Sequence, residues 1–369
     1  MKYKIPQLIP FLGNEELANL EIVIKNKWLT EGPFSEEFLS IIKDFTGAKY
    51  AVLANNGTLA LFLALKAIGI NPGDEVIVPD FTFIASATSI VFSGGVPLFT
   101  DVDYNNLNIN VDEIEKKITK QTKAIMPVHV YGQSANMEPI VNLATKYKLK
   151  IVEDAAQGFG VFYKNKHVGT IGDIGIISFF ADKTITTGEG AVILTNKEEI
   201  YNNLKYLRNQ GRLNSGSFIH PYLGMNFRMT DLQCAIGVAQ IKKFNEIKKI
   251  KLINYNIYKD KLNNIDEIDF VKEEEYSNLV PFRVNIRVEF LEKLIEYLEN
   301  NGIQTRKFFY PLHRQPCFQY LNYNIHDFPI TNKLNEVGLS LPIYPDLKEI
   351  EINYICDKIR TFYKNENRS

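Results

Sequence analysis

The sequence of 369 residues has little of several features that mark specialised protein classes. Its three cysteines, Cys234, Cys317 and Cys356, stand far apart without the spacing of metal ligands, which indicates a reducing compartment, no disulfide framework and no metal site. The net charge is −1 and both signs are interleaved, so no surface for nucleic acid or membrane is indicated. The N-terminal segment has no signal-peptide core, and no apolar run is long enough to span a bilayer. We therefore expect a cytoplasmic protein.

Length and hydrophobic patterning favour one large and one smaller domain. From about residue 50, short apolar runs alternate with longer amphipathic runs. The expected strands are 51–53, 75–78, 96–101, 124–129 and 150–153, and the expected helices are 58–68, 82–92, 111–118 and 135–147. This alternation predicts an α/β fold with a mostly parallel sheet flanked by helices.

The pattern changes after residue 195. Thr230 and Asp231 are expected to cap a long helix that bridges two domains. A smaller α/β unit follows, with a strand at 284–288, a helix at 289–299 that ends at Asn301-Gly302, and a strand at 303–309. We expect a large domain over residues 1–245, including an N-terminal arm, and a small C-terminal domain over residues 246–369.

Lys183 lies in a polar, glycine-bearing turn between two apolar runs, 176–180 and 191–194. The runs are typical of buried strands, and the turn would hold the lysine at the rim of a sheet. Partial burial there lowers the pKa of a lysine and makes its neutral, nucleophilic amine accessible. Such an amine is required for a Schiff base with an aldehyde cofactor.

A second motif, Asn55-Asn56-Gly57-Thr58, follows an expected strand and opens an expected helix. The free N–H groups at the start of a helix bind phosphate, and glycine permits close approach. A simple helix cap is the alternative interpretation.

Asp154 comes directly after the strand at 150–153, at the edge of the sheet where ligands of open α/β folds bind. A carboxylate there can pair with a protonated pyridine nitrogen, and Gln157 could reach the same ligand. The alternative for Asp154 is a helix cap.

Ser178 and Phe83 complete the constellation. The Ser178 hydroxyl could donate to a phosphate, or bond to its own backbone. Phe83, after the strand at 75–78, could stack on a flat heterocycle, or belong to the core. A phosphate anchor, a stacking ring, a carboxylate, a hydroxyl and a reactive lysine together predict a pyridoxal 5'-phosphate site.

These residues resemble the DegT/StrS family of sugar aminotransferases, over nearly the whole chain from about Pro6 to beyond Pro345. Further matching segments are 28–33, 72–79, 127–132 and 224–229. Within the family the sequence is most similar to the GDP-perosamine synthases, on Ser178-Phe179-Phe180, residues 183–190 and residues 308–313. The resemblance implies the type I aminotransferase fold.

The resemblance also implies a role for each matching residue. Lys183 would hold the cofactor and carry the proton, Asp154 would contact the pyridine nitrogen, Gln157 the ring hydroxyl and Phe83 the ring face. The phosphate would be bound by Gly57, Thr58, Ser178 and, from the partner subunit of a homodimer with shared active sites, Asn226. Trp28, Tyr310 and His313 match segments near the substrate, with a core or loop role as the alternative.

Two positions depart from the family pattern. Ala191 replaces a glycine that is common after Glu189-Gly190. Residues 279–285 stand where perosamine synthases usually carry an aromatic pair that includes Trp. Arg283 in this segment could face a phosphate or carboxylate of the substrate, or be a solvated strand residue.

The expected reaction moves the amino group of L-glutamate to a keto sugar nucleotide, GDP-4-keto-6-deoxymannose-like, for surface polysaccharide biosynthesis. A small phosphorylated ketone such as dihydroxyacetone phosphate is an alternative acceptor. A dehydratase branch of the family carries histidine where this chain has Lys183. A non-catalytic cofactor-binding regulator is a further alternative, whereas a dinucleotide-dependent oxidoreductase is disfavoured because no Gly-x-Gly-x-x-Gly follows an early strand.

Overall fold

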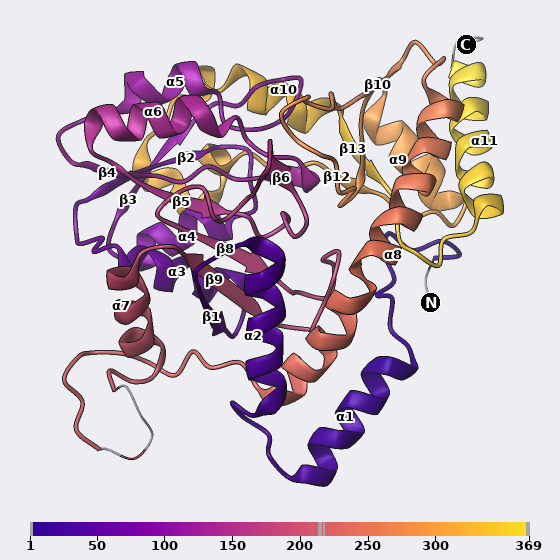
Figure 1. The fold of residues 1–369 in the computed structure, drawn as a ribbon. Helices are drawn as coiled ribbons and strands as arrows, with labels where there is room; N and C mark the ends of the chain where they lie inside the picture. The colour runs from indigo at the N-terminus through magenta and orange to yellow at the C-terminus, as the bar shows by residue number, and fades with distance from the viewer. Residues whose placement is uncertain (1–2, 213–215, 217, 367–369) are drawn as a thin grey trace.

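A computed structural model describes residues 3–212, 216 and 218–366. Figure 1 shows a large unit built around a sheet, a smaller unit beside it, and helix α8 (Asp231–Leu262) running between the two. Thr230 caps α8 as expected, because its hydroxyl accepts a hydrogen bond from the Gln233 N–H. No helix in the described part of the chain is long and apolar enough to cross a membrane.

The large unit contains a seven-stranded sheet in the order β1-β9-β8-β5-β4-β2-β3. The strands are β1 (Tyr50–Ala54), β9 (Ala191–Thr195), β8 (Ile174–Ser178), β5 (Lys150–Asp154), β4 (Thr122–Ile125), β2 (Glu75–Pro79) and β3 (Val96–Thr100). Only β9 runs antiparallel to its neighbours; β8, β5, β4, β2 and β3 pair in parallel. The predicted mostly parallel sheet is thus confirmed.

Helices cover both faces of this sheet. One face carries α3 (Gly57–Ala67), α4 (Ala85–Phe92) and α7 (Glu198–Arg208), and the other carries α2 (Pro33–Thr46), α5 (Val111–Lys117), α6 (Met137–Tyr147) and the first half of α8. Successive strand residues enter different cores: Leu53 packs on the α2 side and Val52 on the α3 side. Strands buried on both faces explain the continuous apolar runs in the sequence.

The small unit is an antiparallel sheet, β10 (Ile268–Phe270), β11 (Val284–Val288), β13 (Gly338–Leu341) and β12 (Arg306–Lys307) in that order, packed with α9 (Leu291–Asn300) and α11 (Glu349–Glu366). Ile5 belongs to this core and pairs with Ile303. The chain therefore starts against the small unit, before α1 (Asn14–Asn26) and α2.

Between β12 and β13 the chain returns to the large unit. This stretch contains the 3₁₀ turns η2 (Leu312–Arg314), η3 (Pro316–Leu321) and η4 (Ile325–Asp327) and helix α10 (Pro329–Val337). Leu312, Phe318 and Phe328 are buried in the α3-side core. The expected division after residue 245 falls within α8, and it stays a prediction.

Three local predictions need correction. The expected strand at 303–309 is reduced to β12, because only Arg306 and Lys307 pair with β13. The helix expected from residue 82 begins at Ala85, and the strand expected at 124–129 ends at Ile125. After Ile125 the chain continues through Val128, which bridges to Asp154, into the turn η1 (Val130–Gly132). The hairpin β6 (Phe162–Tyr163) and β7 (Lys166–His167) was not predicted.

Candidate functional site

A cavity of about 540 Å³ opens where the ends of β2, β5 and β8 and the start of α3 face the small unit. The large unit contributes Asn56, Gly57, Thr58, Leu61, Thr82, Phe83, Ala85, Val128, Asp154, Ala156, Gln157, Ser178, Phe180, Asp182, Lys183 and Glu189. The small unit contributes Phe282, Arg283, Arg306, Lys307 and Phe309. Eight of the predicted site residues thus line one cavity.

Lys183 lies in the turn between β8 and β9, where its backbone N–H bonds to the Phe180 carbonyl at 2.9 Å. Its side chain is 15% exposed, and its Nζ lies 3.5 Å from Asp182 Oδ1 and 4.9 Å from the centre of the Phe282 ring. Burial lowers the pKa of Lys183, while the carboxylates of Asp182 and Asp154 oppose that lowering. The amine therefore deprotonates more readily than a surface lysine, as a nucleophile needs.

Asp154 ends β5 and is 4% exposed. Its carboxylate accepts hydrogen bonds from the Ser86 hydroxyl at 2.7 Å and the Ala156 N–H at 3.1 Å. Burial raises its pKa, whereas those two donors and the charge of Lys183 act in the opposite direction. A cation placed in the cavity beside this carboxylate would gain a desolvated partner. Sequence reasoning missed Ser86, whose position in α4 gives no signal by itself.

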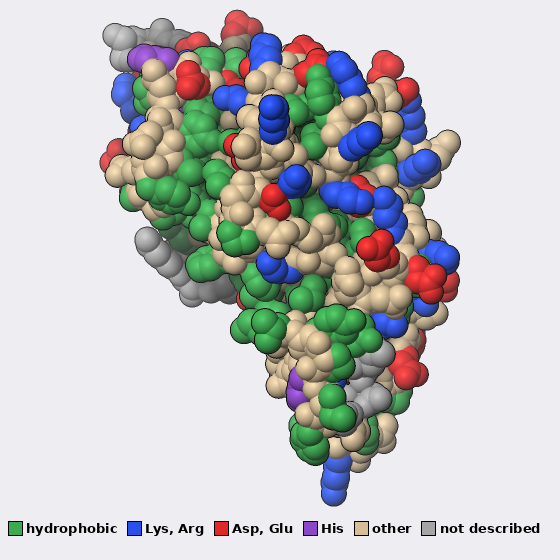
Figure 2. All heavy atoms as spheres, turned by 90° about the vertical axis from the view of Figure 1, so that its left-hand side faces the viewer, with side chains coloured by type: hydrophobic (Ala, Val, Ile, Leu, Met, Phe, Trp, Pro, Cys, Tyr) green, Lys and Arg blue, Asp and Glu red, His purple; other side chains and the backbone are tan. Residues whose placement is uncertain are grey.

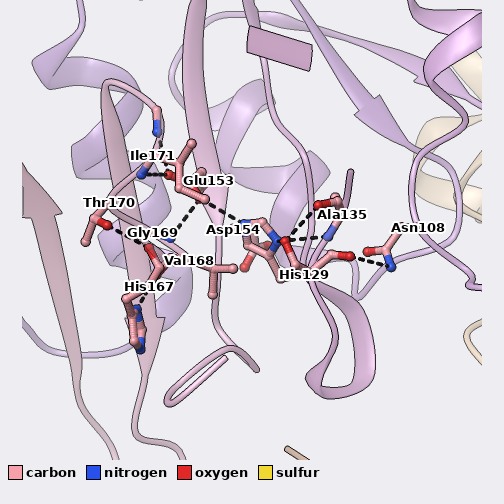
Figure 3. A network of polar contacts seen from close by, with 12 residues as sticks. Asn108, His129, Ala135, Glu153, Asp154, His167, Val168, Gly169, Thr170 and Ile171 are labelled. Carbon is pink, nitrogen blue, oxygen red and sulfur yellow. Dashed lines mark hydrogen bonds and ion pairs between the residues drawn. The ribbon is translucent and has the colours of Figure 1, made fainter. Parts of the chain in front are cut away.

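Glu153, the residue before Asp154, anchors the end of β5 through the polar contacts drawn in Figure 3. Glu153 is fully buried and accepts hydrogen bonds from His129 Nε2 at 3.0 Å and from the backbone N–H groups of Gly169, Ile171 and Gly172. The Ala135 N–H donates to the other ring nitrogen of His129, which leaves the proton on Nε2. This network fixes the backbone from which Asp154 projects toward the cavity.

The start of α3 forms the opposite end of the cavity. The Asn56 side chain accepts a hydrogen bond from the Leu59 N–H at 3.0 Å, so the helix cap and the cavity wall coexist in one turn. A Cβ added to Gly57 would lie 3.1 Å from the Ser178 Cβ and 3.2 Å from its Oγ. Gly57, Thr58 and Ser178 are thus close together, and a side chain at position 57 would fill the space between them.

The structure bears on the alternative interpretations of Ser178 and Phe83, which were a hydrogen bond to its own backbone and a place in the core. The Ser178 Oγ accepts a bond from the Phe180 N–H at 3.3 Å, so it does bond locally while lining the cavity. Phe83 is 58% exposed and is not a core residue. Its ring faces the cavity with its centre 6.5 Å from that of Phe309.

Gln157 is held by a residue in an unusual backbone conformation. Its Oε1 accepts a hydrogen bond from the Tyr131 N–H at 2.7 Å. Tyr131 has a φ of 53°, in the left-handed region, and its ring stacks on Phe309 at 5.2 Å. The hydrogen bond from this N–H fixes the side-chain amide of Gln157 at the cavity wall.

Arg283 lines the cavity, and its Nη2 donates to Asp182 Oδ2 at 3.2 Å. It is therefore no solvated strand residue. Sequence reasoning missed Asp182, Arg306 and Lys307, which also line the cavity. Arg306 and Lys307 lie in a strand that pairs only at two residues.

Four predicted residues do not line the cavity of this chain. Trp28 is 60% exposed and Tyr310 is 43% exposed, with the Arg314 guanidinium 5.2 Å from the Tyr310 ring. Asn226 is exposed and accepts a bond from the Arg228 N–H. Because they are exposed, these three stay predictions for contacts with a substrate or a second subunit.

His313 lies in the interior, contrary to the expectation of a substrate contact from within this chain. Its Nδ1 contacts the buried Asp80 carboxylate at 2.7 Å, and its ring stacks on Phe328 at 4.4 Å. Its backbone N–H also donates to Asp80 at 2.7 Å. The physical reason is that the buried carboxylate needs these donors, which tie η2 to the end of β2.

Comparisons with known proteins agree with this geometry. The chain is 38% identical to a GDP-perosamine synthase of Escherichia coli O157:H7, covering 99% of this chain and 100% of that protein, and 35% identical to one of Vibrio cholerae, covering 97% and 99%. The solved structure of S. venezuelae DesV in complex with a ketimine intermediate superposes with a TM-score of 0.90 at 28% identity, over 94% of each chain. The fold is thus that of an aminotransferase.

The profile of the DegT/DnrJ/EryC1/StrS aminotransferase family matches residues 10–360. The chain belongs to this family and is a pyridoxal phosphate-dependent aminotransferase. The site fits such a cofactor: the space beside Gly57 and Ser178 suits a phosphate, Asp154 offers a buried carboxylate, and Lys183 offers an amine with a lowered pKa.

Proposed function

We propose that this enzyme transfers the amino group of L-glutamate to a keto sugar nucleotide, GDP-4-keto-6-deoxymannose-like, giving a perosamine-type product for surface polysaccharide biosynthesis. The full-length similarity to proteins named GDP-perosamine synthase supports this acceptor. The observation that carries the amine transfer is the placement of Lys183, Asp154 and the start of α3 around one cavity.

In this proposal each residue of the cavity has one task. Gly57, Thr58 and Ser178 hold the cofactor phosphate at the positive end of α3. Asp154 would pair with the protonated pyridine nitrogen, and Phe83 and Gln157 would hold the ring. When bound, the cofactor supplies an aldehyde that accepts the amine and a ring that withdraws electrons.

Lys183 then moves the proton. Its lowered pKa gives it a neutral amine near physiological pH more often than an exposed lysine has, so it can accept the proton from the donor carbon next to the amino group and, in the second half of the reaction, donate a proton to the carbonyl carbon of the acceptor. Burial of the side chain to 15% exposure restricts exchange of that proton with bulk water.

The acceptor is tested by a panel of ketones. The purified enzyme is converted to its colourless amine form with L-glutamate, and each ketone is then added alone. The panel contains GDP-, dTDP- and UDP-linked 4-keto-6-deoxy sugars, 3-keto sugars and dihydroxyacetone phosphate. We expect the yellow aldehyde form to return fastest with the GDP-linked sugar.

The other outcomes separate the alternatives. Recovery with dihydroxyacetone phosphate alone would replace the sugar acceptor by a small phosphorylated ketone, which the presence of Arg283 in the cavity also accommodates. A yellow protein that L-glutamate does not bleach would contradict amine transfer and favour a cofactor-binding regulator.

We also propose a homodimer with shared active sites. The segment before Asn226 exposes large apolar side chains: Phe218 is 89%, Ile219 76%, Tyr222 57%, Leu223 94% and Met225 60% exposed. Figure 2 shows hydrophobic side chains along the left of one face and down into its lower part, whereas charged side chains of both signs lie mainly along the top and right. Apolar patches of this kind mark protein interfaces.

Mixed subunits test the shared site. Lys183→Ala and Asn226→Ala variants are purified separately, then mixed and allowed to exchange subunits. If Asn226 acts in the partner's cavity, a hybrid dimer contains one site with both residues intact, and activity should rise above that of either variant. Mixing without any gain would contradict the shared site.

A further inference from the structure

The carboxylate of Asp182 contacts three cations that come from three separate segments. Its Oδ2 lies 3.2 Å from Arg283 Nη2 and 3.7 Å from Arg306 Nη1, and its Oδ1 lies 3.5 Å from Lys183 Nζ. Asp182 and Lys183 belong to the turn after β8, whereas Arg283 directly precedes β11 and Arg306 begins β12. The cluster therefore joins the two units across the cavity.

Positive charge exceeds negative charge in this cluster, and most of it is shielded from water. The side chains of Arg283, Lys183 and Asp182 are 12%, 15% and 17% exposed. Nearby Lys251 of α8 is 2% exposed, and its pKa is lowered to about 7 by burial, an effect that Arg283 strengthens and Asp182 opposes. Buried charges of one sign are costly unless a counter-charge joins them.

The cluster also has hydrogen-bonding capacity to spare. In the described part of the chain, the Arg283 side chain makes one hydrogen bond, to Asp182, although a guanidinium carries five N–H donors. The Arg283 guanidinium is kept in place by the Phe282 ring, 5.1 Å away.

Arg283 and Arg306 line the cavity on the side of the small unit, whereas the start of α3 and Ser178 line it on the side of the large unit. Two guanidinium groups with free donors suit an anion that has at least two oxygens, such as a carboxylate or a phosphate. The cavity thus has an anion-binding group besides the one that fits the cofactor phosphate.

We propose that Arg283 and Arg306 form a receptor for an anionic oxygen group of the substrate, and that Asp182 is their shared counter-ion. The proposal rests on the proposed function, because it assigns this group to the substrates of the amine transfer. Two substrates can supply this anionic oxygen group: the amino donor through a carboxylate, or the acceptor through a phosphate.

Binding of two substrate fragments to the cofactor-loaded enzyme tests the proposal. Glutarate carries carboxylates without an amine, and guanosine diphosphate carries phosphates without a sugar. Calorimetric titration gives the affinity of each for the wild type, Arg283→Gln and Arg306→Gln. We expect roughly a 10- to 100-fold loss with Arg283→Gln for one probe, and a smaller loss with Arg306→Gln, which is 47% exposed.

The probe that loses affinity identifies the source of the anion. Arg360→Gln on α11, a variant at an exposed ion pair with Asp357, is the matched control and should bind both probes like the wild type. Because Arg306 is half-exposed, its variant tests the receptor even if Arg283→Gln does not fold. Wild-type affinity of both variants for both probes, or no binding of either probe by the wild type, would overturn the proposal.

Asp182→Asn tests the role of the counter-ion. This change keeps the size of the side chain and removes a negative charge beside the incoming anion, so the affinity for the probe should rise roughly 3- to 10-fold at low salt. A fall in affinity would contradict the counter-ion role. An enzyme that behaves as expected in these titrations but transfers no amino group would disprove the proposed function and leave the receptor standing.

Discussion

The two sides of the cavity are built differently. The large-unit side, with Gly57, Asp154, Ser178 and Lys183, comes from strand ends and one helix start of a single sheet whose strands are buried on both faces. The small-unit side, with Arg283 and Arg306, comes from a separate antiparallel sheet. The first side is fixed by one rigid element, whereas the second depends on how two sheets are placed relative to each other. We expect chemistry on the first side and selection of the substrate on the second.

The largest effect should come from Lys183→Ala. Loss of the proton-transferring amine should reduce turnover by at least about 10²–10⁴-fold, because general acid–base transfer contributes that much. The fold should persist, because the Lys183 side chain lines the cavity. Steady-state kinetics and circular dichroism measure the two quantities.

Lys25→Ala on α1 is the matched control. Because Lys25 is 72% exposed, this variant should leave turnover and the circular dichroism spectrum unchanged. Substantial activity in Lys183→Ala would contradict the difference between the two sides, because the large-unit side would then not carry the chemistry.

Asp154→Asn should have the next largest effect. The amide keeps the shape but not the charge that a protonated pyridine needs, so turnover should fall by roughly 10²–10³-fold. In the cofactor-free protein the same change should not lower the thermal midpoint, because burial already raises the pKa of this carboxyl and disfavours its charge. A lower midpoint together with normal turnover would reverse our assignment.

Gly57→Ala should have a smaller effect, confined to cofactor binding. The added Cβ would lie 3.1 Å from the Ser178 Cβ and narrow the phosphate site, so cofactor affinity should fall roughly 3- to 10-fold. Titration of the cofactor-free protein measures it. Because Ala favours helices over Gly, the thermal midpoint should not fall.

Lys251→Met should have the smallest effect on turnover and a pH-dependent effect on stability. The pKa of Lys251 is about 7 in the folded protein and higher in the unfolded chain, so its burial penalty is fully present below pH 7 and fades as the pH rises from 7 toward 10. The free energy of unfolding of the variant should therefore exceed that of the wild type at pH 7 by roughly a few kcal/mol, and this difference should shrink by pH 10. Denaturant unfolding at both pH values measures it, and a constant difference would contradict the lowered pKa.

Sequence reasoning found most of the large-unit side. Gly57, Phe83, Asp154, Ser178 and Lys183 each follow a recognisable apolar run, and ends of parallel strands meet at one sheet edge. It missed Ser86, the second residue of α4, and the contact between His129 and Glu153, which are 24 residues apart. Hydrogen bonds between separate elements leave no periodic signal in a sequence.

Most of the small-unit side of the cavity could not be predicted from the sequence alone. Arg306 and Lys307 belong to a two-residue strand without alternation, and Asp182 attracts notice only once Arg283 and Arg306 are seen beside it. His313 shows the opposite error: its matching segment predicted a substrate contact, but Asp80, 233 residues away, holds it in the interior.

The sequence by itself determined the alternating strands and helices, the mostly parallel sheet and the placement of a lysine and an aspartate at its edge, because hydrophobic periodicity and strand ends are local properties of a chain. Only the tertiary structure decided which cations share Asp182, which donors satisfy Asp154 and which matching residues stay outside the cavity. Those relations depend on the packing of two sheets against each other, and contacts between distant segments are fixed by three-dimensional fit.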